Sequence, residues 1–249
     1  RTESTEIRMA LAATVQELRA QVRAIEAPGA RAGAMTLGHQ NALPDLALGC
    51  LHEVTGDPGD LCAATGFAAG LVARLSQHAG AGAGGPVLWC GRAHETHEHG
   101  GLYAPGLDEF GLGPERLLVV RARTDTQVLW AMEEGLRCRA LSAVVGELDD
   151  PGFTPSRRLQ LAAEAGGVTA VLLRTRSAAA TGAVTRWHVT SASTRQDEEM
   201  NVPRWQVQLE RHRGGDLGGW NVEWRNETGD FSVAASVRDV QPQSTKIAS

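Results

Sequence analysis

The sequence predicts an α/β protein built on a mostly parallel sheet with helices on both faces. From residue 50 to residue 174, short and nearly continuous apolar runs alternate with stretches of helical periodicity. Parallel strands that are buried on both faces show this pattern, and each needs a crossover helix to reach the next. Beyond residue 185 apolar and polar residues alternate, which is typical of antiparallel strands. We therefore expect a parallel core, an antiparallel C-terminal extension of the same sheet and an N-terminal helix.

The first 27 residues carry a helical stripe of apolar side chains that ends before Pro28 and Gly29. We expect an N-terminal helix over residues 1–27 and a connector without periodicity over residues 28–45. The helix packs either on its own domain or on a neighbouring molecule, and its stripe supplies candidate partner-binding residues. These residues are Ile7, Leu11, Val15, Leu18 and Val22.

The core is expected over residues 46–226, followed by a partly flexible tail over residues 227–249. Its predicted parallel strands are 50–54, 86–90, 116–122, 140–145 and 168–174, and its predicted helices are 61–77, 125–137 and 155–165. The antiparallel strands are expected at 186–192, 204–212 and 220–224.

The charge composition excludes several kinds of chemistry. The chain has 24 Lys and Arg against 29 Asp and Glu, a net charge of -5, and Lys246 is its only lysine. A phosphate-loop lysine, a Schiff-base lysine and a lysine general base are therefore excluded from the core, and general polyanion binding is disfavoured. The four cysteines have no CxxC spacing, which predicts buried free thiols, and no apolar run approaches the roughly 18 residues of a membrane span. A cytoplasmic chain is expected.

The turn after the first core strand stands where many α/β folds bind phosphate through backbone N–H groups. A working phosphate loop has the pattern GxxxxGK[ST], whereas this turn has no lysine and carries two aspartates and a proline. Its acids would repel a phosphate. We interpret it as a degenerate nucleotide loop made of Gly56, Asp57, Pro58, Gly59, Asp60 and Thr65.

The order of several motifs resembles the ImuA family, RecA-like accessory proteins of the bacterial ImuA–ImuB mutasome. The resemblance covers residues 43–224, and its most specific stretches are GLYAPGL, DTQVLWAMEEGLR and RGGDLGGWNVEW. It implies a RecA-like fold whose two acid positions fall at Arg92 and Gly146. Glu147, Asp149 and Asp150 lie close to the second position, as a metal site or as a solvated strand end. Because these positions and the lysine have changed together, we expect no catalytic residue, no cofactor and no residual nucleotide binding.

The resemblance further implies a non-catalytic adaptor in SOS-induced, error-prone translesion DNA synthesis. Its expected partners are an ImuB-like protein and an error-prone polymerase III alpha-type subunit, with RecA and a second copy of the chain as further candidates. One alternative is a regulatory inhibitor that caps RecA filaments or blocks cell division. Another is a metal-dependent hydrolase that uses a histidine loop, whose ligands would be His94, His97 and His99; an exposed loop without metal is the competing interpretation.

Two further groups of residues are candidates for binding. Arginines beside a small glycine-containing loop suit weak contact with single-stranded DNA phosphates, and these are Arg174, Arg176 and Arg186. Tryptophan and arginine are frequent at protein interfaces, and the C-terminal strands concentrate Trp205, Arg211, Arg213, Trp220 and Trp224. The same tryptophans could equally lie in the core, and the resemblance favours partner binding.

Overall fold

The computed structural model describes residues 33–38, 43–78, 84–93, 101–174, 180–192 and 202–236. Together they form an α/β fold with one nine-stranded sheet and one small two-stranded sheet. The large sheet has the order β11-β10-β9-β8-β3-β7-β6-β4-β5. Within the described residues, no helix has both the length and the apolar character needed to span a membrane.

The parallel part of the sheet contains six strands. They are β3 (Leu51–Gly56), β4 (Val87–Arg92), β5 (Leu117–Ala122), β6 (Ala143–Leu148), β7 (Thr169–Arg174) and β8 (Thr185–Ser191). Each is parallel to its neighbours within this group, including β8, which pairs with β3. The five apolar runs of the sequence correspond to the strands β3 to β7, so the prediction of a parallel core is confirmed. The alternating run at residues 186–192 was expected to be antiparallel, and this is corrected: β8 is parallel to β3 and antiparallel only to β9, because it lies where the two parts of the sheet meet.

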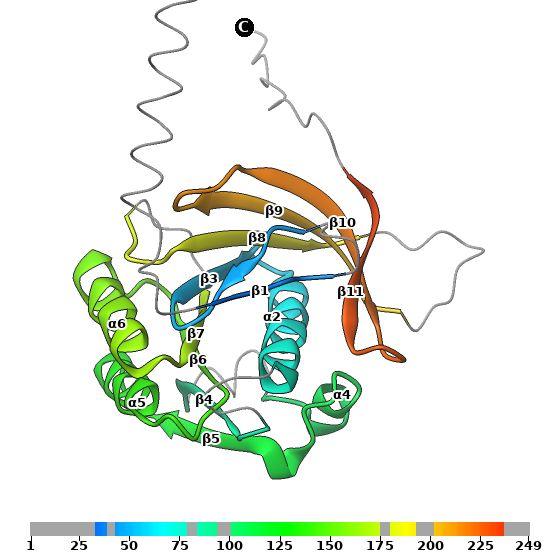
Figure 1. Ribbon diagram of the computed structural model, residues 1–249. Coiled ribbons are helices and arrows are strands. Elements are labelled where there is room, and N and C mark those ends of the chain that lie inside the picture. The colour runs from blue at the N-terminus through cyan, green and yellow to red at the C-terminus, as the bar shows by residue number, and fades with distance from the viewer. Residues whose placement is uncertain are drawn as a thin grey trace, which may run out of the picture.

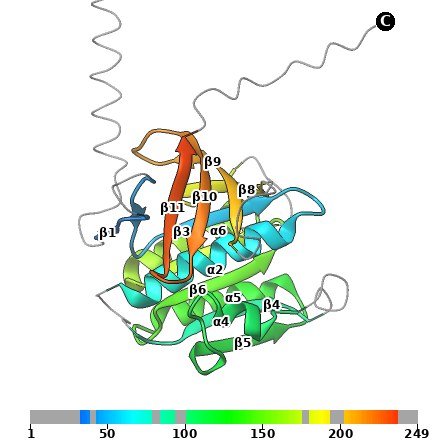
Figure 2. The ribbon, with the colours of Figure 1, turned by 90° about the vertical axis from the view of Figure 1, so that its right-hand side faces the viewer.

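The antiparallel part begins where β8 meets β9. Its strands are β9 (Arg204–His212), β10 (Gly218–Arg225) and β11 (Asp230–Ser236). β11 corrects the expectation of a tail over residues 227–249, because it pairs with β10 and buries Phe231. Figures 1 and 2 show this end of the sheet curving around the helix α2 (Leu61–Gln77).

Helices cover both faces of the sheet, as the sequence predicts (Figure 1). On one face α2 packs against β3, β7 and β8, and on the other α5 (Asp125–Arg137) and α6 (Phe153–Gly166) pack side by side. Thr124 caps α5 by accepting a hydrogen bond from the backbone N–H of Gln127. The short helices α4 (Ala104–Asp108) and η2 (Pro114–Arg116) precede β5.

An aromatic cluster fills the space between α2 and the curved end of the sheet. Phe67 on α2 lies 5.9 Å from both Trp187 and Trp205 between ring centroids, and 5.1 Å from Phe231. A Cβ atom on Gly70 would lie 2.7 Å from Cζ of Phe231, so α2 needs a glycine there to approach the cluster. These rings join β8, β9 and β11 to the parallel core.

The segment expected to be a connector, residues 28–45, contains structure that the sequence did not reveal. β1 (Ala34–Met35) pairs with β2 (Leu46–Ala47) in the small antiparallel sheet. Met35 and Leu43 are buried beside it. Strands of two residues are too short to show alternation, which is why the sequence analysis missed them. The N-terminal helix expected over residues 1–27 lies outside the described residues.

Candidate functional site

The turn between β3 and α2, residues 56–60, is bonded to the end of β8. The carboxylate of Asp60 accepts hydrogen bonds from the backbone N–H of Ser191 at 2.6 Å and from its hydroxyl at 2.7 Å. Oδ1 of Asp57 lies 3.2 Å from Nε2 of His188. Asp60 is also the residue that precedes the first turn of α2, where a negative charge interacts favourably with the helix dipole. Both acids of the turn thus have partners within the chain.

The remaining loop positions serve local structure. Gly56 stands where a Cβ atom would lie 3.1 Å from Cβ of Ala64, so it allows the strand end to approach α2. Gly59 has a φ of 98°, which favours glycine. The hydroxyl of Thr65 donates to the carbonyl oxygen of Leu61, one turn earlier in α2. In this arrangement the hydroxyl is engaged within the helix.

The two acid positions implied by the family resemblance hold no carboxylate. Arg92, at the end of β4, forms ion pairs with Asp125 at 3.2 Å and with Asp149 at 3.0 Å. Gly146 lies under Met132, whose Sδ would be 2.1 Å from a Cβ atom placed there. A side chain larger than hydrogen at residue 146 would therefore require the end of the Met132 side chain to move.

The acids near residue 146 point to different partners. Oε1 of Glu147 accepts a hydrogen bond from Nε1 of Trp89 at 2.6 Å, and Asp150 pairs with Arg174 at 2.7 Å. Within the ranges that the structure describes, no group of three or more His, Cys, Asp and Glu side chains is placed to hold a metal ion. His94, His97 and His99 lie outside those ranges.

Arg174 and Arg186 are buried in an ionic cluster, so the expectation that they stand on an exposed loop is wrong. Nη1 of Arg174 lies 3.0 Å from Oε1 of Glu53, and Nε of Arg186 lies 2.9 Å from Oε2 of the same carboxylate. The hydroxyl of Thr181 donates to Glu53 at 2.6 Å. Glu53 lies on the central strand β3 between β7 and β8, and its charge draws both guanidinium groups inward. Arg176 lies outside the described residues.

The tryptophans of the C-terminal strands are mostly core residues, which agrees with the core alternative rather than with the favoured interpretation as partner-binding anchors. Trp205 and Trp224 are buried, and Trp220 is half-buried against the core. Nε of Arg211 donates to the carbonyl oxygen of Ala183, and Arg213 donates to that of Gly182. β11 pairs with β10 and covers the outer edge of the hairpin formed by β9 and β10. The candidates Ile7, Leu11, Val15, Leu18 and Val22 lie outside the described residues.

Two of the four cysteines are exposed, which corrects the expectation that all are buried. All four are free thiols; Cys62 and Cys138 are exposed, while Cys50 and Cys90 are buried. Burial raises the pKa of the Cys90 thiol to about 12 and also raises that of Cys50. Both buried thiols therefore stay protonated at neutral pH.

His52 is a buried polar residue that the sequence analysis did not single out. Burial lowers its pKa to about 4, so the imidazole is neutral. Nε2 lies 2.7 Å from the carbonyl oxygen of Ala47, and Nδ1 lies 2.7 Å from Oγ1 of Thr185. Since only a donor can face the carbonyl, Nε2 carries the proton and Nδ1 accepts from Thr185. His52 thus joins the small sheet to β3 and β8.

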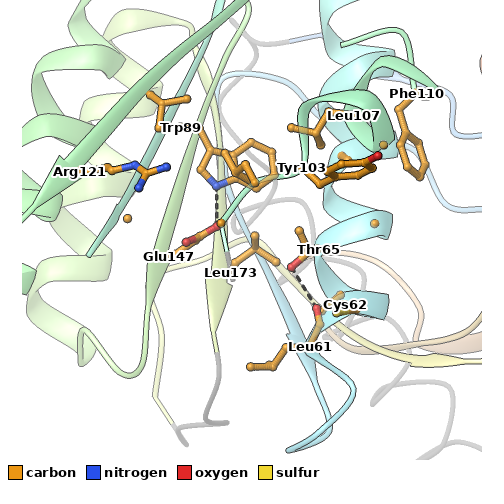
Figure 3. A pocket seen from close by; sticks show the side chains of 18 of the residues that line it. Leu61, Cys62, Thr65, Trp89, Tyr103, Leu107, Phe110, Arg121, Glu147 and Leu173 are labelled. Carbon is orange, nitrogen blue, oxygen red and sulfur yellow. Dashed lines mark hydrogen bonds between the residues drawn. The ribbon is translucent and has the colours of Figure 1, made fainter. Parts of the chain in front are cut away.

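The structure also reveals a pocket beside α2 that sequence reasoning missed. It has a volume of about 350 Å³ and lies between α2, α4, β4 and β5 (Figure 3). Its lining includes Leu61, Cys62, Thr65, Trp89, Tyr103, Leu107, Phe110, Val119, Arg121, Glu147 and Leu173. The apolar runs predicted the strands that carry several of these residues, but no sequence pattern shows that α2 and α4 leave a space between them.

The parallel sheet, the antiparallel extension and the turn at residues 56–60 define the class of this protein. A solved KaiC-like protein from Pyrococcus horikoshii superposes with a TM-score of 0.50 and 15% sequence identity, over 82% of this chain and 99% of that one. That likeness confirms a RecA- and KaiC-like α/β fold. No family model matches the sequence.

Curated relatives identify the family. Protein ImuA from two strains of Caulobacter vibrioides is 36% identical over 193 residues, which is 72% of this chain and 76% of the relative. The chain belongs to the ImuA family, as its motifs indicated. Membership in this family supports a role related to DNA damage.

Proposed function

We propose that this chain is a non-catalytic, RecA-like adaptor in an error-prone translesion DNA synthesis complex. It would link an ImuB-like protein to an error-prone polymerase III alpha-type subunit. The observation that carries the non-catalytic part is the turn at residues 56–60, which lacks the lysine of a phosphate loop and directs Asp57 and Asp60 toward β8. The ImuA family membership supports the adaptor part.

Nucleotide hydrolysis has little support in the arrangement of these side chains. Phosphoryl transfer needs positive charge and a metal beside the phosphates. Here the turn carries two carboxylates, Arg92 is paired with Asp125 and Asp149, and Gly146 stands where the family resemblance implies an acid. We therefore expect no phosphate release from ATP and magnesium above the buffer rate, with an active RecA protein as the positive control. Measurable, protein-dependent hydrolysis that survives repurification would contradict the proposal.

The adaptor role is tested by reconstitution from purified components. The chain, the ImuB-like protein and the alpha-type polymerase are combined in pairs and all together, and their elution is compared by size-exclusion chromatography. An adaptor predicts that the polymerase and the ImuB-like protein elute together only when the chain is present. If the two proteins form the same complex without it, the chain is not the link.

Co-purification from cells after DNA damage separates the adaptor from the regulatory alternative. The adaptor predicts recovery of the ImuB-like protein and the polymerase with the tagged chain. An inhibitor of RecA filaments or of cell division predicts recovery of RecA or a division protein without the polymerase. No contact in the described residues favours the inhibitor over the adaptor.

A further inference from the structure

The pocket beside α2 is mainly apolar inside, and two of the polar groups of its wall are already bonded. Nε1 of Trp89 donates to Glu147, and the hydroxyl of Thr65 donates to the backbone of Leu61. Leu107 and Phe110 form the wall on the side of α4 (Figure 3). The surface that remains for an occupant is therefore largely hydrocarbon and aromatic, which suits an apolar side chain.

Apolar surface continues from this interior to the rim of the pocket. Tyr103 is 72% exposed and Val119 is 48% exposed, and both line the pocket. Large apolar side chains that are exposed next to a cavity mark interaction surfaces, and tyrosine is frequent where a partner anchors. The apolar rim would be covered together with the pocket when a partner binds.

A single positive charge stands at the rim. Arg121 is exposed on the edge strand β5 and lines the pocket, and it has no ion-pair partner among the described residues. Arg174 also lines the pocket, but it is buried and paired with Glu53 and Asp150, and Arg92 on the neighbouring strand β4 is paired with Asp125 and Asp149. Arg121 is therefore the cation that an acidic group of an occupant would meet.

We infer that the pocket receives one bulky apolar side chain, leucine or an aromatic residue, from a protein partner that places an acidic residue against Arg121. The inference rests on the proposed function, because the partner is the ImuB-like protein of the adaptor complex. A protein is favoured over a nucleic acid because the chain has a net charge of -5 and the pocket wall is mainly apolar.

Paired variants test the pocket and its rim in the full chain. Thr65→Phe places a ring in the pocket, and Arg121→Glu reverses the charge at the rim. The matched controls are Thr126→Phe, which adds the same ring at an exposed position of α5, and Arg123→Glu, which reverses an exposed charge outside the pocket.

Affinity for the ImuB-like protein is measured by interferometry. The two pocket variants should weaken binding about tenfold or more, as the loss of an anchor does, while the controls stay within about twofold.

A peptide panel tests the pocket without the partner. Capped tripeptides of the form Asp-Xaa-Asp, with leucine, phenylalanine or alanine in the centre, are added to labelled protein and followed by NMR. The leucine and phenylalanine peptides should shift the indole N–H of Trp89 and the amide of Gly106, both at the pocket, and Arg121→Glu should reduce these shifts. The alanine peptide should leave them unchanged.

The outcomes separate this inference from the proposed function. If the partner binds wild type and pocket variants equally, the pocket inference is overturned and the adaptor stands. If the partner binds none of them, the adaptor fails, and the peptides alone decide the pocket: shifts support it and their absence overturns it. Shifts from an oligothymidylate and none from the peptides overturn the protein occupant in favour of a nucleic acid. Should Thr65→Phe fail to fold by circular dichroism, Val119→Trp blocks the pocket from its half-exposed rim instead.

Discussion

Two regions of the molecule differ in what their side chains leave available. In β3 and the turn that follows it, the acids Glu53, Asp57 and Asp60 all bind groups of the same chain. A few residues further along α2, the pocket exposes Tyr103 and leaves Arg121 without an ion-pair partner among the described residues. The first region stabilises the fold, whereas the second offers surface to another molecule. Each prediction below tests one side of this contrast.

The largest expected effect is on the ionic cluster. Glu53→Gln removes the charge that faces the two buried guanidinium groups of Arg174 and Arg186. Because unpaired buried charges are costly, the free energy of unfolding should fall by about 3 to 5 kcal/mol, measured by urea denaturation with tryptophan fluorescence. Glu227→Gln, at an exposed turn, is the control and should change it by about 0.5 kcal/mol or less. A similar small loss for both variants would show that the cluster contributes little.

The second effect is a loss of stability in acid that depends on His52. Its pKa is about 4 in the folded protein and near 6.5 in the unfolded chain, so the unfolded chain binds a proton first as the pH falls. The contribution of His52 is complete above pH 6.5 and declines by about 3 kcal/mol as the pH falls toward 4.

Comparison with a variant isolates this contribution. His52→Gln cannot titrate, so the difference in free energy of unfolding between wild type and variant should shrink between pH 7 and pH 4.5. Denaturant unfolding at a series of pH values measures it. A constant difference across this range would mean that His52 does not resist protonation in the folded protein.

A smaller effect is expected at the turn before α2. Asp60→Ala removes the acceptor of two hydrogen bonds from Ser191 and a charge that favours the helix N-terminus. The free energy of unfolding should fall by about 1 kcal/mol. Asp60→Asn keeps an acceptor and should lose less, while neither variant should gain ATP hydrolysis. Thermal denaturation and a phosphate-release assay check both statements.

The smallest effect on stability is expected at the rim of the pocket. Tyr103→Ala changes a side chain that is 72% exposed, so the free energy of unfolding should change by about 0.5 kcal/mol or less. Affinity for the ImuB-like partner should nevertheless decrease, because the rim is part of the proposed contact. A large fall in the free energy of unfolding would show that Tyr103 stabilises the fold. The pocket rim would then not differ from the region around Glu53, Asp57 and Asp60 in this respect.

Much of the fold was predictable because its signals are local. The helices Leu61–Gln77 and Asp125–Arg137 begin and end where the sequence predicts, the second after the capping residue Thr124. The five apolar runs between residues 50 and 174 became parallel strands, whereas the alternating run at residues 186–192, expected to be antiparallel, became the parallel strand β8. β11 was missed because its alternation through Phe231 and Val233 is short and follows a polar turn. The two-residue strands β1 and β2 had no detectable period.

The candidate site was predictable only in part. The loss of lysine at the turn of residues 56–60 is visible in the sequence, but its bonds to His188 and Ser191 join positions about 130 residues apart. Arg174 was expected to contact DNA beside a loop, but Glu53, 121 residues earlier in the chain, holds it inside the protein. An arginine beside a loop has the same sequence pattern whether it meets solvent or a buried carboxylate.

By itself the sequence determined the class of fold, the family resemblance and the absence of a phosphate-loop lysine, because these depend on residue type and local periodicity. Only the tertiary structure decided which tryptophans and arginines are buried and that a pocket lies between α2, α4 and β5. Burial depends on which strand forms the edge of the sheet and which side chains meet across it. These are properties of contacts between distant segments, and no local pattern contains them.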